Sequence, residues 1–296
     1  MPRCVASLLA QTYENLEIIF VDDCSTDGSR EFLEENIKKF KNAKLLFHSE
    51  NKNLFLTRLS AMKACTGEYV ICLDSDDYVD KNYYETLHSA MVSMNADFCV
   101  GDFSVDKDEN LLNLMSPFEK ECFLNKECLE KFFSHNSDQM ICLWNKMLRK
   151  DLFHKFLEDV ERYAQNAEGI NCCEDCLFLF MMLYHAKKMI QVFGPKYHYV
   201  QHKNQSICIS DNTILQIQLN SLYKVSTKLT QFICDKNLTE KYFESIQGKM
   251  LYVLRSLKYY TYKNSIQIDD DLREMLRAAS LRNIMEAAKG GERWFL

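Results

Sequence analysis

The chain has 296 residues, of which 47% are hydrophobic and 26% are charged, so it is long enough to bury a sizeable core. Its formal net charge of −6 argues against a nucleic-acid partner, because such binding depends on basic surfaces. No stretch reaches the roughly 18 consecutive apolar residues that a membrane span needs, and residues 1–4 are followed by too weak an apolar run for a signal peptide. We therefore expect a cytoplasmic protein whose 13 cysteines are reduced thiols.

Strand and helix patterns alternate through the first hundred residues. The stretches with helical spacing of apolar residues are 5–12, 30–40 and 54–65. The short apolar runs typical of strands are 16–21, 44–48 and 68–73. This alternation predicts an α/β fold with a mostly parallel sheet and flanking crossover helices.

Acidic residues follow two of the predicted strands. Asp22 and Asp23 end the first, and Asp74, Asp76 and Asp77 follow the buried run of the last. Because ligands of open α/β sheets bind beyond the carboxyl ends of strands, both groups can line one crevice. Mg²⁺ or Mn²⁺ prefers carboxylate and phosphate oxygens, which suggests a metal held for a nucleoside diphosphate. Taken alone, however, an Asp-x-Asp-Asp run is more often an acidic, solvated turn.

Two long motifs resemble those of a known enzyme family. Residues 7–29 (SLLAQTYENLEIIFVDDCSTDGS) resemble the first conserved block of family 2 glycosyltransferases, and residues 66–77 (TGEYVICLDSDD) resemble their metal-binding D-x-D block. The resemblance implies a Rossmann-like GT-A fold, a nucleotide-sugar donor and inverting transfer. More loosely, the chain looks like bacterial lipooligosaccharide galactosyl- and glucosyltransferases. We expect a donor-binding part at 1–100, an acceptor-binding and catalytic part at 101–210, and a mainly helical region at 211–296.

The resemblance implies a role for each strand-end acid. Asp23 matches the residue that hydrogen-bonds the donor base, such as the imide N–H of uracil, and Asp22 supports the turn beside it. Asp76 matches the direct metal ligand, with Asp77 helping to hold the metal. Asp74 is expected to contact the ribose or the sugar.

Arg58 matches a family arginine near the donor base or the diphosphate, whose negative charge would suit a guanidinium. A solvated position on the helix face is equally expected. The neighbouring residues depart from the family pattern, because Asn53, Leu59 and Ala61 stand where Gly, Asn and Gly are common.

The start of the chain differs most from the family. Members normally open with a hydrophobic strand and a loop that lies under the nucleotide, whereas this chain begins at what looks like the end of that loop. Without such a strand the sheet would expose an unpaired apolar edge. We therefore expect either that the reading frame begins upstream or that the chain is a truncated copy, which would put its activity in question.

A third acidic group, the pair Glu174 and Asp175, is the candidate catalytic site. Glu174 and Asp175 precede the apolar run 177–183, which predicts a helix start at this pair. They resemble the family's x-E-D motif, in which the aspartate is the general base that deprotonates the acceptor hydroxyl. Acids at a helix N-terminus are also ordinary partners of the helix dipole.

Two further segments resemble parts of the family's cleft. In residues 143–149 (LWNKMLR), Trp144 would stack on a sugar face and Asn145 or Lys146 would hydrogen-bond the acceptor, although a tryptophan in the core is equally expected. Residues 197–206 resemble the strand and loop after the catalytic helix. The candidate diphosphate contacts there are His202, Lys203 and Ser206, against the more common case of a surface histidine.

Together these resemblances imply transfer of a hexose from a UDP-sugar to a saccharide on a bacterial surface glycolipid, such as lipooligosaccharide or capsule, with Mg²⁺ or Mn²⁺. Residues 251–263 mix apolar, aromatic and basic side chains, as either an interfacial helix at the inner membrane or a plain packing helix would. One rival is a non-catalytic remnant of the fold. Another is a nucleotidyltransferase, but that class usually has a Gly-rich phosphate loop, which is not visible here.

Overall fold

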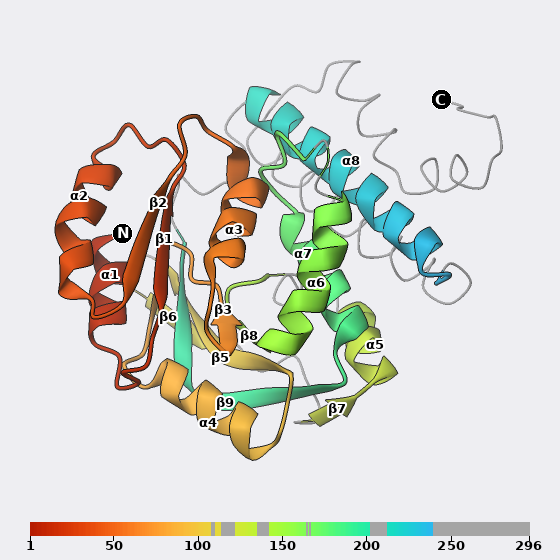
Figure 1. Ribbon diagram of the computed structural model, residues 1–296, viewed down its shortest axis with the longest axis horizontal. Helices are drawn as coiled ribbons and strands as arrows, with labels where there is room; N and C mark the ends of the chain where they lie inside the picture. The colour runs from red at the N-terminus through yellow and green to blue at the C-terminus, as the bar shows by residue number, and fades with distance from the viewer. Residues whose placement is uncertain are drawn as a thin grey trace.

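The computed structural model describes residues 1–107, 110–113, 122–134, 142–163, 165, 167–201 and 212–238 (Figure 1). The helices are α1 (Pro2–Leu9), α2 (Ser29–Asn36), the 3₁₀ helix η1 (Ile37–Lys39), α3 (Asn53–Ala64), α4 (Tyr83–Ser93), α5 (Lys126–Ser134), α6 (Lys150–Tyr163), α7 (Glu174–His185) and α8 (Asn212–Asp235). The strands are β1 (Ile18–Asp22), β2 (Ala43–Phe47), β3 (Tyr69–Ile71), β4 (Tyr78–Val79), β5 (Phe98–Lys107), β6 (Asn110–Asn113), β7 (Cys122–Leu124), β8 (Lys146–Arg149) and β9 (Lys188–Gln201). Within the described ranges, no helix is both long and apolar enough to cross a membrane.

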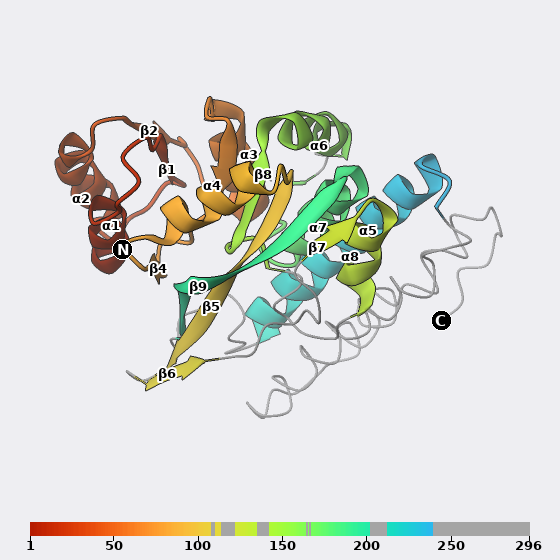
Figure 2. The ribbon, with the colours of Figure 1, turned by 90° about the horizontal axis from the view of Figure 1, so that it is seen from below.

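The described strands form two sheets. A seven-stranded sheet has the order β3-β8-β5-β9-β4, with β6 added to β5 and β7 to β9, and a separate sheet joins β1 to β2. In Figure 2, β5 and β9 run side by side through the centre of the molecule, and this pair is parallel, like β1–β2. The remaining pairs are antiparallel. The α/β class is therefore confirmed, but the sheet is mixed rather than mostly parallel, because β8 enters between β3 and β5 and runs opposite to both.

The first sheet is tied to the second by side chains rather than by strand pairing. Among the described residues, β1 pairs only with β2. Just before β1, the carboxylate of Glu17 accepts hydrogen bonds from the backbone N–H groups of Thr66 (2.7 Å) and Gly67 (3.2 Å), which precede β3. It also pairs with Lys44 at 2.7 Å. Burial raises the pKa of Glu17, but these contacts outweigh it and lower the pKa to about 2.

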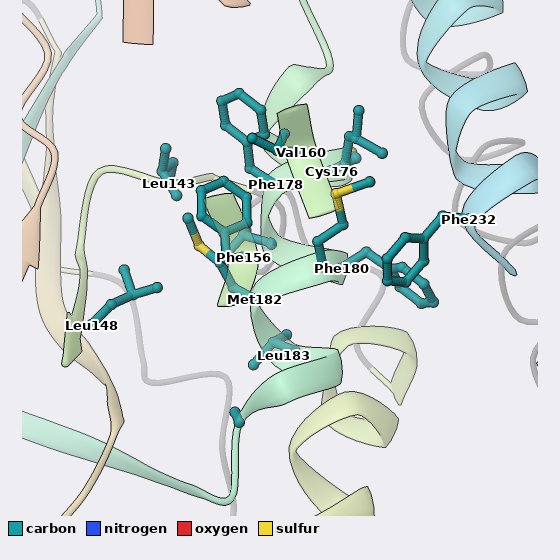
Figure 3. Close-up of a cluster of buried hydrophobic side chains, with 14 of the residues drawn as sticks. Leu143, Leu148, Phe156, Val160, Cys176, Phe178, Phe180, Met182, Leu183 and Phe232 are labelled. Atoms are coloured by element: carbon teal, nitrogen blue, oxygen red, sulfur yellow. The ribbon is translucent and has the colours of Figure 1, made fainter. Parts of the chain in front are cut away.

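Helix α7 lies at the centre of the main hydrophobic core (Figure 3). Its sequence is apolar on all sides, which is typical of a fully buried helix. The ring centroid of Phe178 lies 4.9 Å from that of Phe55 in α3 and 5.5 Å from that of Phe156 in α6. The ring centroids of Phe180 and of Phe232 in α8 are 5.8 Å apart. Because neighbours cover it on several faces, the N-terminus of α7, which carries Glu174 and Asp175, is held in a fixed place.

Candidate functional site

Helix α3 contacts each of the three acidic clusters that the sequence motifs single out, at 22–23, 74–77 and 174–175. Its first residue, Asn53, donates to Asp23 at the end of β1. Its sixth residue, Arg58, pairs with Asp74 in the turn after β3, and with Glu174 and Asp175 at the start of α7. Acids that are far apart in the sequence are thus gathered along one helix.

Asp23 organises the loop that leads into α3. Its carboxylate accepts hydrogen bonds from the backbone N–H groups of Lys52 (2.9 Å) and Asn53 (3.0 Å), and lies 2.6 Å from Nδ1 of His48. Burial raises the pKa of Asp23, but these hydrogen bonds outweigh it and hold the pKa below its usual value. Asp22 is buried and accepts a hydrogen bond from the Ser25 backbone at 3.3 Å, as expected of a residue that supports the turn. The predicted contact of Asp23 with the donor base stays a prediction.

The left-handed backbone at Asn53 explains one departure from the family pattern. This residue has φ 75° and is buried, and its side-chain oxygen accepts a hydrogen bond from the Leu56 backbone at 3.3 Å. Glycine adopts positive φ freely, and asparagine is among the few other residues that tolerate it. Asparagine is therefore a compatible replacement where glycine is common.

Replacing Asn53 with alanine should lower the free energy of unfolding by about 1–2 kcal/mol, because alanine at positive φ is strained. Replacing it with glycine should cost less, since glycine relieves the strain and loses only the side-chain hydrogen bond. Chemical denaturation of the two variants measures the difference. Equal losses would show that the backbone conformation is not what the position requires.

The turn after β3 separates its three acids into different environments. Asp76 is exposed, whereas Asp77 is fully buried. One oxygen of Asp77 accepts a hydrogen bond from the Tyr197 hydroxyl (2.5 Å) and the other from the Val200 backbone (2.8 Å). Burial raises the pKa of Asp77 to about 8, against these hydrogen bonds. Asp77 thus anchors the turn to β9, and its predicted help in holding a metal is left untested.

Arg58 links the turn after β3 to the start of α7. Its side chain is 10% exposed, its Nη2 lies 2.8 Å from Oδ1 of Asp74, and its Nη1 donates to both Glu174 and Asp175. Both terminal nitrogens of the guanidinium therefore face carboxylates in this structure. The predicted contact with the donor base or diphosphate stays a prediction, but a solvated helix face is not where Arg58 lies.

Glu174 is buried and Asp175 is half-buried, and both lie in an acidic setting. Burial raises the pKa of Glu174 to about 8, and the neighbouring Asp175 adds to this against the charge of Arg58. Burial likewise raises the pKa of Asp175 above its usual value. The Oδ2 atom of Asp175 accepts a hydrogen bond from the Leu143 backbone at 3.1 Å. Raised carboxyl pKa values suit proton transfer near neutral pH.

The three candidate acceptor contacts are all buried. Trp144 stacks on Tyr197 and on Tyr199, with ring centroids 4.5 Å and 5.5 Å apart, so in this structure it packs as a core residue. Asn145 donates to the Gly101 carbonyl at 2.8 Å, and Lys146 Nζ lies 2.5 Å from the Asn145 side-chain oxygen. These contacts brace the segment that holds Asp175 through Leu143. Their predicted acceptor contacts stay untested.

Some site residues were not expected, and some expected ones lie outside the described ranges. Tyr197 contacts Asp77 and accepts a hydrogen bond from the Asp74 backbone at 3.2 Å; its only sequence signal was its place in the strand after the catalytic helix. The Leu143 backbone donor to Asp175 has no sequence signal at all. The predicted diphosphate contacts His202, Lys203 and Ser206, and the helix predicted at 251–263, lie outside the described residues.

Comparisons with known proteins point in one direction. Residues 1–157 match the family described as glycosyl transferase family 2. The chain is 27% identical over 282 residues to a cholesterol galactosyltransferase of Borreliella burgdorferi, which covers 86% of this chain and 74% of that protein. The structure of S. aureus TarS with UDP-GlcNAc has a TM-score of 0.55 and 17% identity, covering 99% of this chain and 89% of TarS.

Another relative is much longer than the matched region. The glycosyltransferase GlyA of Streptococcus pneumoniae is 29% identical over 171 residues, which is 55% of this chain but only 24% of GlyA. The match thus spans only about a quarter of the length of that protein.

Proposed function

Because the chain belongs to glycosyl transferase family 2 and has the GT-A fold expected from its motifs, we propose that it transfers a hexose from a UDP-sugar to a saccharide acceptor with inversion. The observation that carries the proposal is the gathering of three acidic clusters along α3. Asp23 lies at one end of the helix, and Arg58 joins Asp74 to Glu174 and Asp175 farther along it. The acids proposed for donor recognition and for proton removal thus all lie along α3.

UDP is the proposed nucleotide because TarS, which shares this fold, has been solved with UDP and with UDP-GlcNAc. At 16–17% identity this likeness concerns the fold alone. In our proposal Asp23 hydrogen-bonds the uracil imide and Asp74 contacts the ribose or the sugar. For that, Asp23 would exchange part of its present hydrogen bonding to His48 and to the loop before α3.

Asp175 is the proposed general base. It would accept the proton of the acceptor hydroxyl as the oxygen attacks the anomeric carbon and the bond to UDP breaks, which inverts that carbon. A carboxylate with a raised pKa holds such a proton more readily than an ordinary aspartate. Glu174, which has a pKa of about 8, would carry a proton over much of the neutral range and so reduce the charge repulsion beside the base.

A divalent cation fits the donor set if it arrives with the diphosphate. In the ranges that the structure describes, no three His, Cys, Asp or Glu side chains form a metal cage. Mg²⁺ is commonly held by only one or two carboxylates together with substrate phosphates. The exposed Asp76 would hold it on the protein side, with Asp77 behind it. Mg²⁺ or Mn²⁺ would neutralise charge on the departing diphosphate.

A glycolipid of the bacterial surface is the proposed acceptor. The support is that a relative which matches most of this chain is named as a cholesterol galactosyltransferase, and therefore as an enzyme of a lipid acceptor. Lipooligosaccharide or capsule precursors are the acceptors we propose, on the cytoplasmic face of the inner membrane. A soluble saccharide acceptor would contradict the lipid part of this proposal and leave the transfer itself standing.

One observation favours the rival of a non-catalytic remnant. In the described part of the chain, β1 and β2 form a sheet of their own that makes no strand pairing to the main sheet. Two-stranded sheets are marginally stable by themselves. If β1 moved relative to β3, Asp23 and Asp76 could not bind the same nucleotide, and the chain would not bind the donor.

Asp76→Ala should strongly weaken metal-dependent UDP binding to the chain. Calorimetric titration of UDP with Mn²⁺ should give saturable binding to the wild type, and at least tenfold weaker binding to the variant, because the metal loses its protein ligand. Glu158→Ala, which removes an exposed acid of α6, is the matched control and should bind like the wild type. Unchanged binding by Asp76→Ala would contradict the metal assignment, and no binding by the wild type would favour the remnant.

A further inference from the structure

Arg58 is placed between the donor end of the site and the proposed base. Its guanidinium is nearly buried and contacts three carboxylates that come from two different elements. Asp74 is 16 positions away in sequence, whereas Asp175 is 117 positions away. A single side chain therefore connects the turn after β3 with the N-terminus of α7.

The two oxygens of Asp175 are held by different partners. Oδ1 accepts from Arg58, and Oδ2 accepts from the Leu143 backbone at 3.1 Å. A carboxylate held at both oxygens cannot rotate without breaking one contact. The Leu143 backbone is held in place because the neighbouring Asn145 is hydrogen-bonded to the Gly101 carbonyl. The orientation of the Asp175 carboxylate relative to the donor therefore depends on its contact with Arg58.

We propose that Arg58 is a positioning residue that sets the place of the base Asp175 relative to Asp74, rather than a ligand of the donor diphosphate. The inference rests on the proposed function, because it assumes that Asp175 is the base. Both terminal nitrogens of Arg58 are directed at carboxylates, and a planar guanidinium can join two such groups at fixed geometry. A lysine ammonium is a single point charge that cannot join both carboxylates in this way.

In this role Arg58 affects the rate of turnover but not the affinity for UDP. A base displaced by a fraction of an ångström to an ångström slows proton transfer strongly, while Asp23 and Asp76, which are distinct from the three carboxylates paired with Arg58, keep their proposed contacts with the uracil and the metal. Arg58→Lys should therefore lower kcat for UDP release by roughly 10- to 100-fold. The dissociation constant of UDP with Mn²⁺ should change by less than about threefold.

The experiment compares Arg58→Lys with Arg162→Lys, whose arginine is exposed on α6, in the full chain. Calorimetry with UDP and Mn²⁺ gives the affinity. Release of UDP from UDP-galactose, UDP-glucose and UDP-GlcNAc, with a glycolipid extract as acceptor, gives kcat and KM. If Arg58→Lys does not fold, Arg58→Gln, whose side-chain amide can still donate a hydrogen bond to one of the carboxylates, takes its place. In an Asp175→Asn background, the Arg58 change should have no further effect on kcat, because residues that act as a unit are not additive.

A lowered kcat of Arg58→Lys with retained UDP affinity supports the positioning role. A tenfold or greater loss of UDP affinity with kcat preserved at saturating donor overturns it, because Arg58 would then be a donor ligand. An equal further loss of kcat in the Asp175→Asn background also overturns it. If the wild-type chain neither binds UDP nor releases it from any donor, the proposed function itself is wrong.

Discussion

Asp175→Asn should lower the rate of UDP release from a UDP-hexose by about 10²- to 10⁴-fold, the usual contribution of a general base. Asparagine has nearly the same shape and can still accept the Leu143 hydrogen bond, so the fold and UDP affinity should be retained. The rate at saturating donor, measured with UDP affinity in the same preparation, separates loss of the base from loss of binding.

Asp151→Asn is the matched control for this change. Asp151 also lies in the first turn of a helix, α6, but its side chain is 80% exposed and pairs only loosely with Arg149 at 3.8 Å. Its replacement should leave the rate unchanged. If Asp175→Asn turned over donor at the wild-type rate, the base would have to be another group, and Asp175 would be an ordinary acid at a helix N-terminus.

Phe178→Ala should lower the free energy of unfolding by about 3–5 kcal/mol, the cost of removing a buried aromatic ring from a closely packed core. Phe178 is fully buried between α3 and α6, where its ring meets Phe55 and Phe156. The loss is a large part of the roughly 5–15 kcal/mol that stabilises a typical domain. Urea denaturation followed by circular dichroism measures it.

Val92→Ala provides the comparison for the core change, because Val92 is 55% exposed on α4. It should change the unfolding free energy by no more than about 0.5 kcal/mol. A loss below about 1 kcal/mol for Phe178→Ala would contradict the central place of α7, and with it the argument that packing fixes Glu174 and Asp175.

Most elements up to about residue 75 could be predicted because their patterns are local, whereas β4 and α4 were not predicted. The apolar run at 16–21 became β1, the run at 68–73 became β3, and the acids after them stayed at the strand ends. The start of α7 at Glu174 was also predicted, since an acidic pair directly before a long apolar run is a local signal.

The contacts that join these elements could not be predicted, because they depend on residues far apart in sequence. Arg58 was equally expected on a solvated helix face, and only the fold places it against Asp175. The burial of Asp77 depends on Tyr197 and Val200 of β9. In the same way, Lys146 has no local signal that its ammonium group is almost completely buried.

The order of the strands was also beyond local patterns. The alternation of helices and strands covered the chain only to about residue 100, and a parallel arrangement was extended from it. β8 and β9 lie later in the chain, and β8 pairs with both β3 and β5 in the antiparallel sense. A strand can pair with an antiparallel neighbour without a crossover helix. The alternation of helices and strands in the first hundred residues therefore does not predict the position of β8.

Release of UDP from a panel of UDP-hexoses by the wild-type chain, with Mn²⁺ and a glycolipid extract as acceptor, tests the central claim most directly. The account predicts saturable release from at least one donor, abolished by a chelator and reduced by Asp175→Asn. Binding of UDP without release from any donor, or no binding at all, would contradict the claim that the acids gathered along α3 form a working transfer site.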